Sequence, residues 1–335
     1  MPSLHHRSSQ PPPDAISGLS AAADDKEQIA RRWREGLFWA LLSPVFLGTI
    51  PIFAKLAYAT GVDVLTVVAL RTIFAAVVLW TAVLLFARHM IRSSSPGIIG
   101  SLIAGSINGL GSLFYYASLN RIDASVGQLI NISYLLFVTV LLRLYGHTIS
   151  RLTLLRTLLA MTAMYLLTVG GLNKPDWLGA GMMLIAAFTY ALQLVLSQRI
   201  MYDIPAPTMT LYAITAMAGV VTLAWLMFPT KLTAVPRAGW EAIFLMGLVT
   251  ALSRLTLFLG VKRLGSMQTA LLGVLEVIVS IVLAILFLGE RLTAVQWLGA
   301  LLLIICVLLV RYERNVPKFI DWWQIILRRR APHKP

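Results

Sequence analysis

Long apolar stretches separated by short polar segments dominate the chain after residue 35. Ten of these stretches approach the length of about 20 residues that a helix needs to cross the hydrocarbon core of a bilayer. They lie near residues 36–58, 64–87, 96–118, 124–144, 153–171, 177–198, 207–228, 240–261, 267–288 and 293–311. The pattern predicts an all-α membrane protein with ten transmembrane helices.

The composition supports this prediction. The 335 residues are 58% hydrophobic and 13% charged, whereas soluble domains average about 45–50% apolar and 25% charged residues. Lysine and arginine exceed aspartate and glutamate by 28 to 14, but the excess lies in the loops between apolar stretches and not on a soluble domain. We therefore expect the bilayer, and not nucleic acid, as the partner of the basic residues.

The basic residues also predict an orientation, because short cytoplasmic loops retain lysine and arginine. An N-terminus inside the cell places most of them on the cytoplasmic side. The basic residues left outside are Arg121, Lys174, Lys231, Arg237 and Arg291. The sequence thus predicts a multi-pass protein of the cell membrane with both termini cytoplasmic, and it leaves the oligomeric state open.

The chain resembles itself when it is shifted by about 140 residues, which indicates an internal repeat. The shift brings Gly36 onto Gly179 and Gly146 onto Gly289. Each copy holds five spans, an odd number, so the second copy enters the membrane from the opposite side and the repeats are inverted. We expect a disordered tail (1–34), a first five-helix repeat (35–172), a second (173–313) and a basic amphipathic tail (314–335).

One region of the second copy resembles a known family. The segment from Leu288 to Thr293, followed by Trp297-Leu298-Gly299-Ala300, is similar to the end of an EamA domain of the drug/metabolite transporter superfamily, as are Arg71 and the tyrosine-rich segment 114–119. The resemblance implies a carrier of small metabolites such as amino acids, commonly directed outward. The chain departs from the family at Tyr134 and Val277, where members often have proline.

Glu276 is the carboxylate farthest from the ends of the predicted spans. It shares a helix face with Thr269, Gly273 and Ser280, and such a small and polar face is expected to point into the bundle. Arg254 lies at a similar distance from the turn between spans eight and nine, so the two can meet near the bilayer midplane. Two interpretations stay open, a structural lock and an ion pair that lines the pathway. Glu276 is also our proton-coupling candidate.

Other polar side chains inside the spans are further pathway candidates, although interhelical hydrogen bonds explain them equally well. They are Asn108, Ser112 and Tyr115 in the third span, Gln128 and Asn131 in the fourth, and Tyr190 and Gln193 in the sixth. Lys55 and Arg71 are candidates too, but for them we favour side chains that reach the headgroups. Gly105 and Gly109 form a GxxxG spacing that indicates helix packing.

No enzyme motif, nucleotide-binding loop or metal-ligand cluster is visible, so we expect no catalysis, no cofactor and no metal. The sequence predicts a secondary active transporter that exports a small polar or amphipathic, amino-acid-like metabolite by alternating access, with a proton as the coupling ion. The alternatives are an exchanger of anionic phosphorylated metabolites that uses Arg254, Arg71 and Lys55, a lipid-head-group flippase, and a membrane scaffold that transports nothing.

Overall fold

The computed structural model describes residues 13–144, 176–228 and 235–309, together with separate positions between 155 and 166. In this part of the chain, short turns join α-helices, with one 3₁₀ helix, η1 (Arg88–Met90). The α-helices are α1 (Pro13–Ala59), α2 (Val64–Phe86), α3 (Ser95–Leu119), α4 (Ala124–Asn131), α5 (Tyr134–Leu144), α7 (Trp177–Ile200), α8 (Ala206–Met227), α9 (Arg237–Leu264), α10 (Ser266–Leu272), α11 (Val274–Leu288) and α12 (Ala294–Leu308).

Among the described residues, seven helical segments are long and apolar enough to cross a membrane, as expected of a multi-pass membrane protein. They are Arg34–Ala59, Val64–Phe86, Ser95–Leu119, Ala124–Leu144, Trp177–Ile200, Ala206–Met227 and Arg237–Leu264. Leu275–Leu288 is a shorter apolar helix. The span predicted at 153–171 lies outside the described residues, apart from separate positions, so the number ten stays a prediction.

The first helix is longer than the span predicted at its position. α1 begins at Pro13, inside the segment that we expected to be a tail, and its apolar part begins at Arg34. The basic segment 314–335 lies outside the described residues. The predicted boundaries of the two tails and the two repeats therefore stay predictions.

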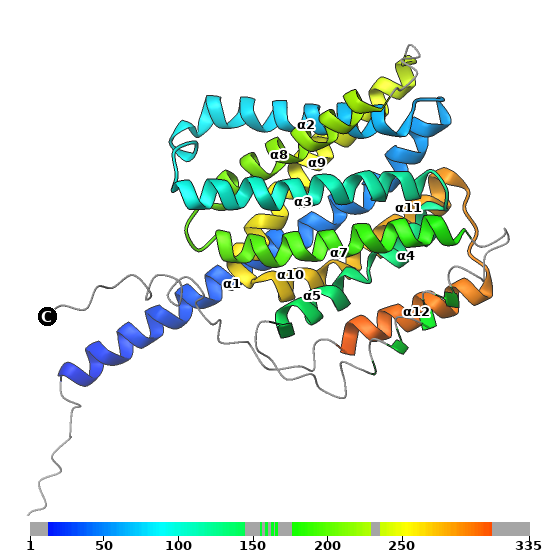
Figure 1. Ribbon diagram of the computed structural model, residues 1–335. Helices are drawn as coiled ribbons and strands as arrows, with labels where there is room; N and C mark the ends of the chain where they lie inside the picture. The colour runs from blue at the N-terminus through cyan, green and yellow to red at the C-terminus, as the bar shows by residue number, and fades with distance from the viewer. Residues whose placement is uncertain are drawn as a thin grey trace, which may run out of the picture.

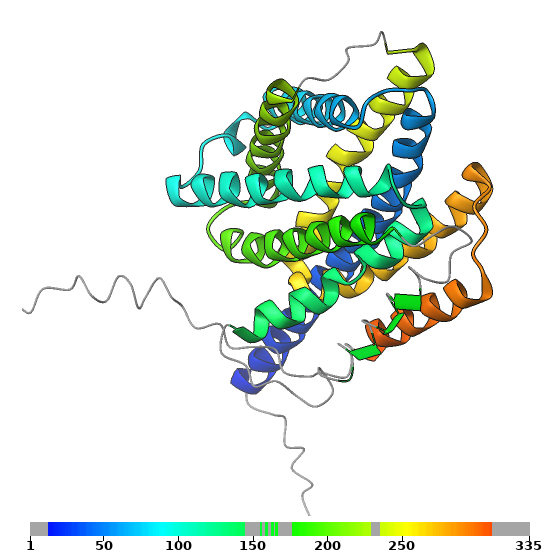
Figure 2. The same cartoon turned by 45° about the vertical axis from the view of Figure 1, so that its right-hand side comes forward.

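At the centre of the bundle, helices of each half of the chain pack against helices of the other half. α1 packs along α9, and α7, which corresponds to α1 in the second half, packs along α3 (Figure 1; Figure 2). In the same way α2 packs against α9 and α8 packs against α3. Such reciprocal packing is what a two-fold relation between the halves produces. It places the interface between the halves in the middle of the protein.

Two glycines allow α3 to approach α8 closely. A methyl group on Gly105 would collide with the backbone of Ala213, and one on Gly109 would come within 3.0 Å of the Cβ of Val220. Small residues at such a crossing let helix backbones pack in van der Waals contact inside a membrane. The interpretation of this GxxxG spacing as a helix-packing feature is confirmed.

Gly105→Ala is therefore expected to destabilise the protein by about 1–3 kcal/mol, the usual cost of overpacking a tight interior. Gly219→Ala, in α8, is the matched control, because a methyl group there meets no other atom within 4 Å and alanine favours helix. The measurement is the melting temperature of each purified variant in detergent. Equal melting temperatures for the two variants would contradict the close approach at Gly105.

Two of the predicted spans are interrupted within the bundle. α4 gives way to α5 between Asn131 and Tyr134, and α10 gives way to α11 at Gly273. At the second break the hydroxyl of Tyr134 donates to the carbonyl oxygen of Ala270 at 3.2 Å. A Cβ on Gly273 would collide with that hydroxyl. The same carbonyl oxygen also accepts from the N–H of Gly273 at 3.0 Å, so a side chain of the first half adds a second hydrogen bond to the interrupted helix of the second.

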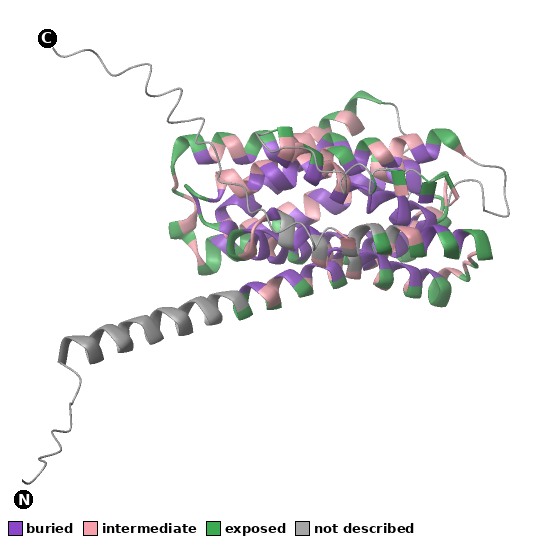
Figure 3. Cartoon of the chain, turned by 90° about the horizontal axis from the view of Figure 1, so that it is seen from below, coloured by how far each residue is buried: buried purple, intermediate pink, exposed green. Residues whose placement is uncertain are grey.

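Burial follows the arrangement expected in lipid. Buried side chains fill the centre, and exposed positions lie on the periphery (Figure 3). The main apolar cluster joins the halves, with Leu129 from the first and Leu194 and Phe258 from the second. Leu110 in α3 and Leu223 in α8 are 52% and 59% exposed, as expected of side chains that face acyl chains.

Candidate functional site

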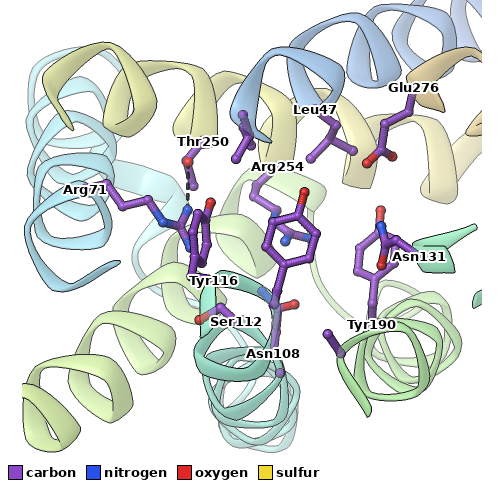
Figure 4. Close-up of a pocket in the computed structure, with 14 residues that line it drawn as sticks. Leu47, Arg71, Asn108, Ser112, Tyr116, Asn131, Tyr190, Thr250, Arg254 and Glu276 are labelled. Carbon is purple, nitrogen blue, oxygen red and sulfur yellow. Dashed lines mark hydrogen bonds between the residues drawn. The ribbon is translucent and has the colours of Figure 1, made fainter. Parts of the chain in front are cut away.

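A polar cavity lies between the two halves, near both helix breaks. The space inside it that can hold water-sized molecules is about 60 Å³. The lining residues come from α1, α2, α3, the end of α4, α7, α9 and α11: Leu47, Ile50, Arg71, Asn108, Gly111, Ser112, Tyr115, Tyr116, Asn131, Ala186, Tyr190, Thr250, Arg254 and Glu276. Figure 4 shows Arg71, Arg254 and Glu276 extending into this space from three different helices.

Arg71 is buried at the cavity wall. Only 2% of its surface is exposed, and its Nη1 donates to the hydroxyl of Thr250 at 2.9 Å (Figure 4). Its guanidinium carbon lies 4.3 Å from the ring centre of Tyr116, within the range of a cation–π contact. The interpretation that Arg71 reaches the headgroups is therefore wrong, because the rotation of α2 turns its side chain toward α9.

Arg254 reaches the same cavity from α9. Its Nη1 donates weakly to the amide oxygen of Gln193 on α7, at 3.4 Å. Its guanidinium carbon is 5.2 Å from the ring centre of Tyr190. The Nε atoms of both Arg254 and Arg71 are buried and have no hydrogen-bond acceptor. Two guanidinium groups whose donors are incompletely used thus line one cavity.

Glu276 lies in the first turn of α11, and its residue surface is 5% exposed. The helix break explains how a carboxylate is held there, since the positive end of a helix dipole favours a negative group. Nε2 of Gln128 donates to Oε1 of Glu276 at 2.7 Å, while Oε2 has no hydrogen-bond partner. One carboxylate oxygen is therefore satisfied, and the other is buried without a partner.

Gln128 is oriented by a second hydrogen bond. The hydroxyl of Tyr115, which lines the cavity, donates to Oε1 of Gln128 at 3.0 Å, and Nδ2 of Asn131 approaches the same oxygen at 3.4 Å. With two donors at the amide oxygen, the amide nitrogen must face Glu276. Gln128 thus connects the cavity wall of the first half to the carboxylate of the second.

The ion pair predicted between Arg254 and Glu276 is not formed in this structure. Arg254 donates to Gln193 and Glu276 accepts from Gln128, although both charged groups line the same cavity. Glu276 lies at the start of α11, where the helix dipole favours a carboxylate, and its hydrogen bond comes from the Gln128 side chain of α4. Pairing in another conformation stays a prediction.

Two further polar wall residues, Asn108 and Ser112, already have partners inside the protein. Nδ2 of Asn108 donates to the sulfur of Met217 at 3.2 Å, and the hydroxyl of Ser112 donates to the carbonyl of Gly109 at 2.8 Å. These contacts agree with interhelical and local hydrogen bonding, yet both side chains still border the cavity. They provide polar surface without net charge.

A smaller second cavity adjoins the first. It shares Leu47, Tyr190 and Glu276 with the first cavity and continues toward Thr269 and Ser43. Because the two cavities have these three residues in common, the side chains form a partition between them. Glu276 therefore borders both spaces.

Lys55 does not line the cavity. It lies nearer one end of the bundle, within electrostatic range of Asp123 and Glu290. Burial, and then the neighbouring Glu290, raise the pKa of the Asp123 carboxyl above its ordinary value, while Lys55 opposes this shift. This charged cluster is separate from the cavity.

Glu290 joins the two halves at that end of the bundle. Gly289 ends α11 in the left-handed conformation, with a φ of 65°, which glycine adopts without strain. Glu290 then accepts hydrogen bonds from the backbone N–H groups of Ala124 and Ser125, at 2.9 and 3.0 Å, and from the Ser125 hydroxyl at 2.6 Å. A carboxylate of the second half thus caps α4 of the first.

The structure brings eight of the eleven predicted pathway residues together at one cavity, places Gln128 and Gln193 directly behind its wall, and leaves Lys55 outside. Sequence reasoning missed Tyr116 and Thr250. Thr250 precedes Arg254 by one helical turn, a spacing that could have indicated it. Among the described residues, no group of three His, Cys, Asp or Glu side chains is placed to hold a metal ion.

Comparisons with known proteins agree with this architecture. The model of the EamA-like transporter family matches twice, at residues 34–169 and 177–312. The uncharacterized transporter YcbK of Bacillus subtilis (strain 168) is 26% identical over 290 residues, which cover 83% of this chain and 92% of that protein. A crystal structure of a protein that is 18% identical superposes with a TM-score of 0.61 and covers 82% of this chain and 96% of that one, which shows similarity of fold.

Proposed function

Because the chain belongs to the EamA-like transporter family, we propose that it is a secondary transporter that carries a small polar or amphipathic metabolite across the membrane by alternating access. One observation carries the proposal: a polar, partly charged cavity bounded by both halves of a duplicated chain. A scaffold that transports nothing has no need of such a cavity.

The packing of the halves supports the inverted repeat on which alternating access depends. Each half packs its first helix against the third helix of the other, α1 on α9 and α7 on α3. In an inverted repeat, each half can adopt the conformation of the other, which closes one face of the cavity and opens the opposite one. The rocking elements are then the packed pairs of helices that line the cavity.

The helix breaks support a binding role for the cavity. Asn131 at the end of α4 and Glu276 at the start of α11 both line it. Interrupted helices near the bilayer midplane present helix dipoles and unpaired backbone groups to substrates and ions in other transporters. Glu276, which borders two cavities, is our candidate for the group that couples transport to a proton.

The starts of the interrupted helices α4 and α10 are capped by hydrogen bonds at opposite ends of the bundle. We propose that these two caps help to close the cavity alternately at one end and at the other. At one end Glu290 of the second half caps α4 of the first. At the other end the amide oxygen of Gln198 accepts from the N–H and the hydroxyl of Ser266 at the start of α10. The first cap joins the halves, and the second lies within one half. We propose that the first cap opens when the cavity opens toward its end of the bundle.

We further propose that the protein resides in the cell membrane with both termini cytoplasmic and that it exports its substrate. Of the described residues near the ends of the helices, the basic Arg88, Arg92, Arg143, Arg199 and Arg263 lie at the end opposite to Glu290. The positive-inside rule then makes that end cytoplasmic. Export follows the common direction of the family that the sequence resembles.

Labelling of single cysteines tests alternating access without a known substrate. Cys306 is the only native cysteine, so Ser112→Cys in a Cys306→Ser background places one thiol at the cavity. We expect a membrane-impermeant thiol reagent to modify it from either side of reconstituted vesicles. Leu110→Cys, two residues away but exposed to lipid, is the matched control and should stay unmodified. If Ser112→Cys behaves like the control, or reacts from one side only, alternating access is wrong.

A further inference from the structure

The charges of the cavity are unequal. Arg71 and Arg254 both stay protonated, because a guanidinium group does not lose its proton in proteins. Glu276 supplies at most one negative charge, and one of its two oxygens is engaged by Gln128. Among the described residues, no other Asp, Glu, Lys or Arg side chain lines this space. The cavity is therefore a cationic site in the interior of the membrane.

The donors of the two arginines are incompletely used. Arg71 gives one hydrogen bond to Thr250, and Arg254 gives one long hydrogen bond to Gln193. The Nε atom of each is buried without an acceptor. A buried donor without a partner is costly, more so when it is charged, and native proteins leave few such groups. Both arginines line the cavity, so acceptor oxygens of a bound ligand would pair with donors of the two guanidinium groups that no protein group engages.

The aromatic contacts determine where an acceptor can approach. Tyr116 holds the Arg71 guanidinium through its ring, with 4.3 Å between the guanidinium carbon and the ring centre, and Tyr190 holds that of Arg254 at 5.2 Å. A ring face attracts a cation but is not a carboxylate-like acceptor for the N–H fork. The guanidinium donors that Thr250 and Gln193 do not engage lie in the guanidinium plane, in which arginine binds carboxylate and phosphate groups.

We propose that the substrate is a small organic anion whose carboxylate or phosphate group binds between Arg71 and Arg254. This inference rests on the transport function proposed above and specifies its substrate class. Tyr115, Tyr116, Leu47 and Ile50 line the same space and suit an apolar or aromatic body attached to the anionic group. Glu276 lines the cavity, and its buried Oε2 without a partner offers a second, oppositely charged group for a substrate that also carries a donor.

Thermal stabilisation of the purified protein tests this substrate class. The probes are inorganic phosphate, acetate, benzoate, succinate and phenyl phosphate, with acetamide, benzamide and succinamide as uncharged analogues, all at millimolar concentration and constant ionic strength. A ligand that binds only the folded protein raises its melting temperature. We expect at least one anion to raise the melting temperature and its uncharged analogue to leave it unchanged.

Variants connect the effect to the two arginines. For Arg254→Gln and for Arg71→Gln, we expect that the same rise in melting temperature requires at least a tenfold higher anion concentration. Arg254→Lys keeps the positive charge but not the planar guanidinium donors, so we expect it to weaken the anion effect less than Arg254→Gln does. This variant replaces the glutamine variants in the test if they fail to fold. Arg237→Gln, which changes an exposed ion pair with Glu241, is the control and should bind as the wild type does.

Three results would overturn the substrate class: no anion stabilises the protein, an uncharged analogue is as effective as its anion, or the anion effect survives unchanged in the Arg71 and Arg254 variants. The test needs no transport, so it is separate from the cysteine labelling. A protein that passes the labelling test and fails this one is a transporter of a different class of substrate. If only the cysteine-labelling test fails, alternating access is contradicted, but the anion-binding site is still supported by the thermal stabilisation.

Discussion

Replacing Gln128 by leucine is expected to lower the free energy of unfolding by about 3 kcal/mol, because the change removes the donor that satisfies a buried carboxylate. Gln128 is fully buried, and its Nε2 donates to Glu276 at 2.7 Å. Oε2 of Glu276 already lacks a partner, so the variant leaves both carboxylate oxygens without a hydrogen bond. Tyr115 loses its acceptor at the same time.

A second variant distinguishes this mechanism from a simple packing defect. Gln128→Leu combined with Glu276→Leu removes both polar partners, and an apolar pair of similar size is nearly neutral compared with one stranded polar group. We therefore expect the double variant to recover most of the melting temperature that the single variant loses. Thermal melts of the purified proteins in one detergent make the comparison. A double variant that is no more stable than Gln128→Leu would mean that the hydrogen bond does not hold Glu276.

Glu290→Ala is expected to have the second large effect, a loss of about 2 kcal/mol in stability, because it removes a helix cap made of charge-assisted hydrogen bonds. It should also release α4 from the second half of the chain. The thiol of Ser112→Cys, placed at the cavity, should then react faster with a reagent added at the Glu290 end, while its rate from the other end is unchanged.

Glu241→Ala is the control for this variant. Glu241 is a carboxylate paired with Arg237, but both side chains are exposed, at 63% and 94%, and an exposed pair of this kind contributes little. We expect its melting temperature and its labelling rates to match those of the wild type. If Glu290→Ala shows the same labelling rates as Glu241→Ala from both ends, the cap does not control access to the cavity.

Much of the site could be predicted because polar side chains within apolar helices repeat with helical spacing. Asn108, Ser112 and Tyr115 share one face of α3, and that face does line the cavity. Arg254 and Glu276 were placed at the same depth from the length of their helices. Helical periodicity predicts which residues of one helix lie together, and the structure agrees with it at these positions.

The partners across the two halves could not be predicted in the same way. Glu276 contacts Gln128, not Arg254, and Arg71 contacts Thr250. These contacts depend on how each helix is rotated about its axis and on which helix of the other half it meets. Neither property follows from the spacing of residues within one helix.

The helix breaks were also missed, because the chain has no proline at either position. The sequence places Tyr134 and Val277 where the family often has proline. In the structure a hydrogen bond from Tyr134 to Ala270, together with the small Gly273, accompanies the second break. A side chain from the other half of the protein thus supports a feature that local sequence signals would assign to proline.

The cap on α4 has a consequence for the synthesis of the protein. Ala124 and Ser125 leave the ribosome long before Glu290, which accepts their N–H groups. Until the second half has been made and inserted, the start of α4 lacks this acceptor, and Gln128 lacks its carboxylate partner. The first half inserted alone is therefore incomplete in its hydrogen bonding, and its fourth span reaches its final conformation only after nearly the whole chain has entered the membrane.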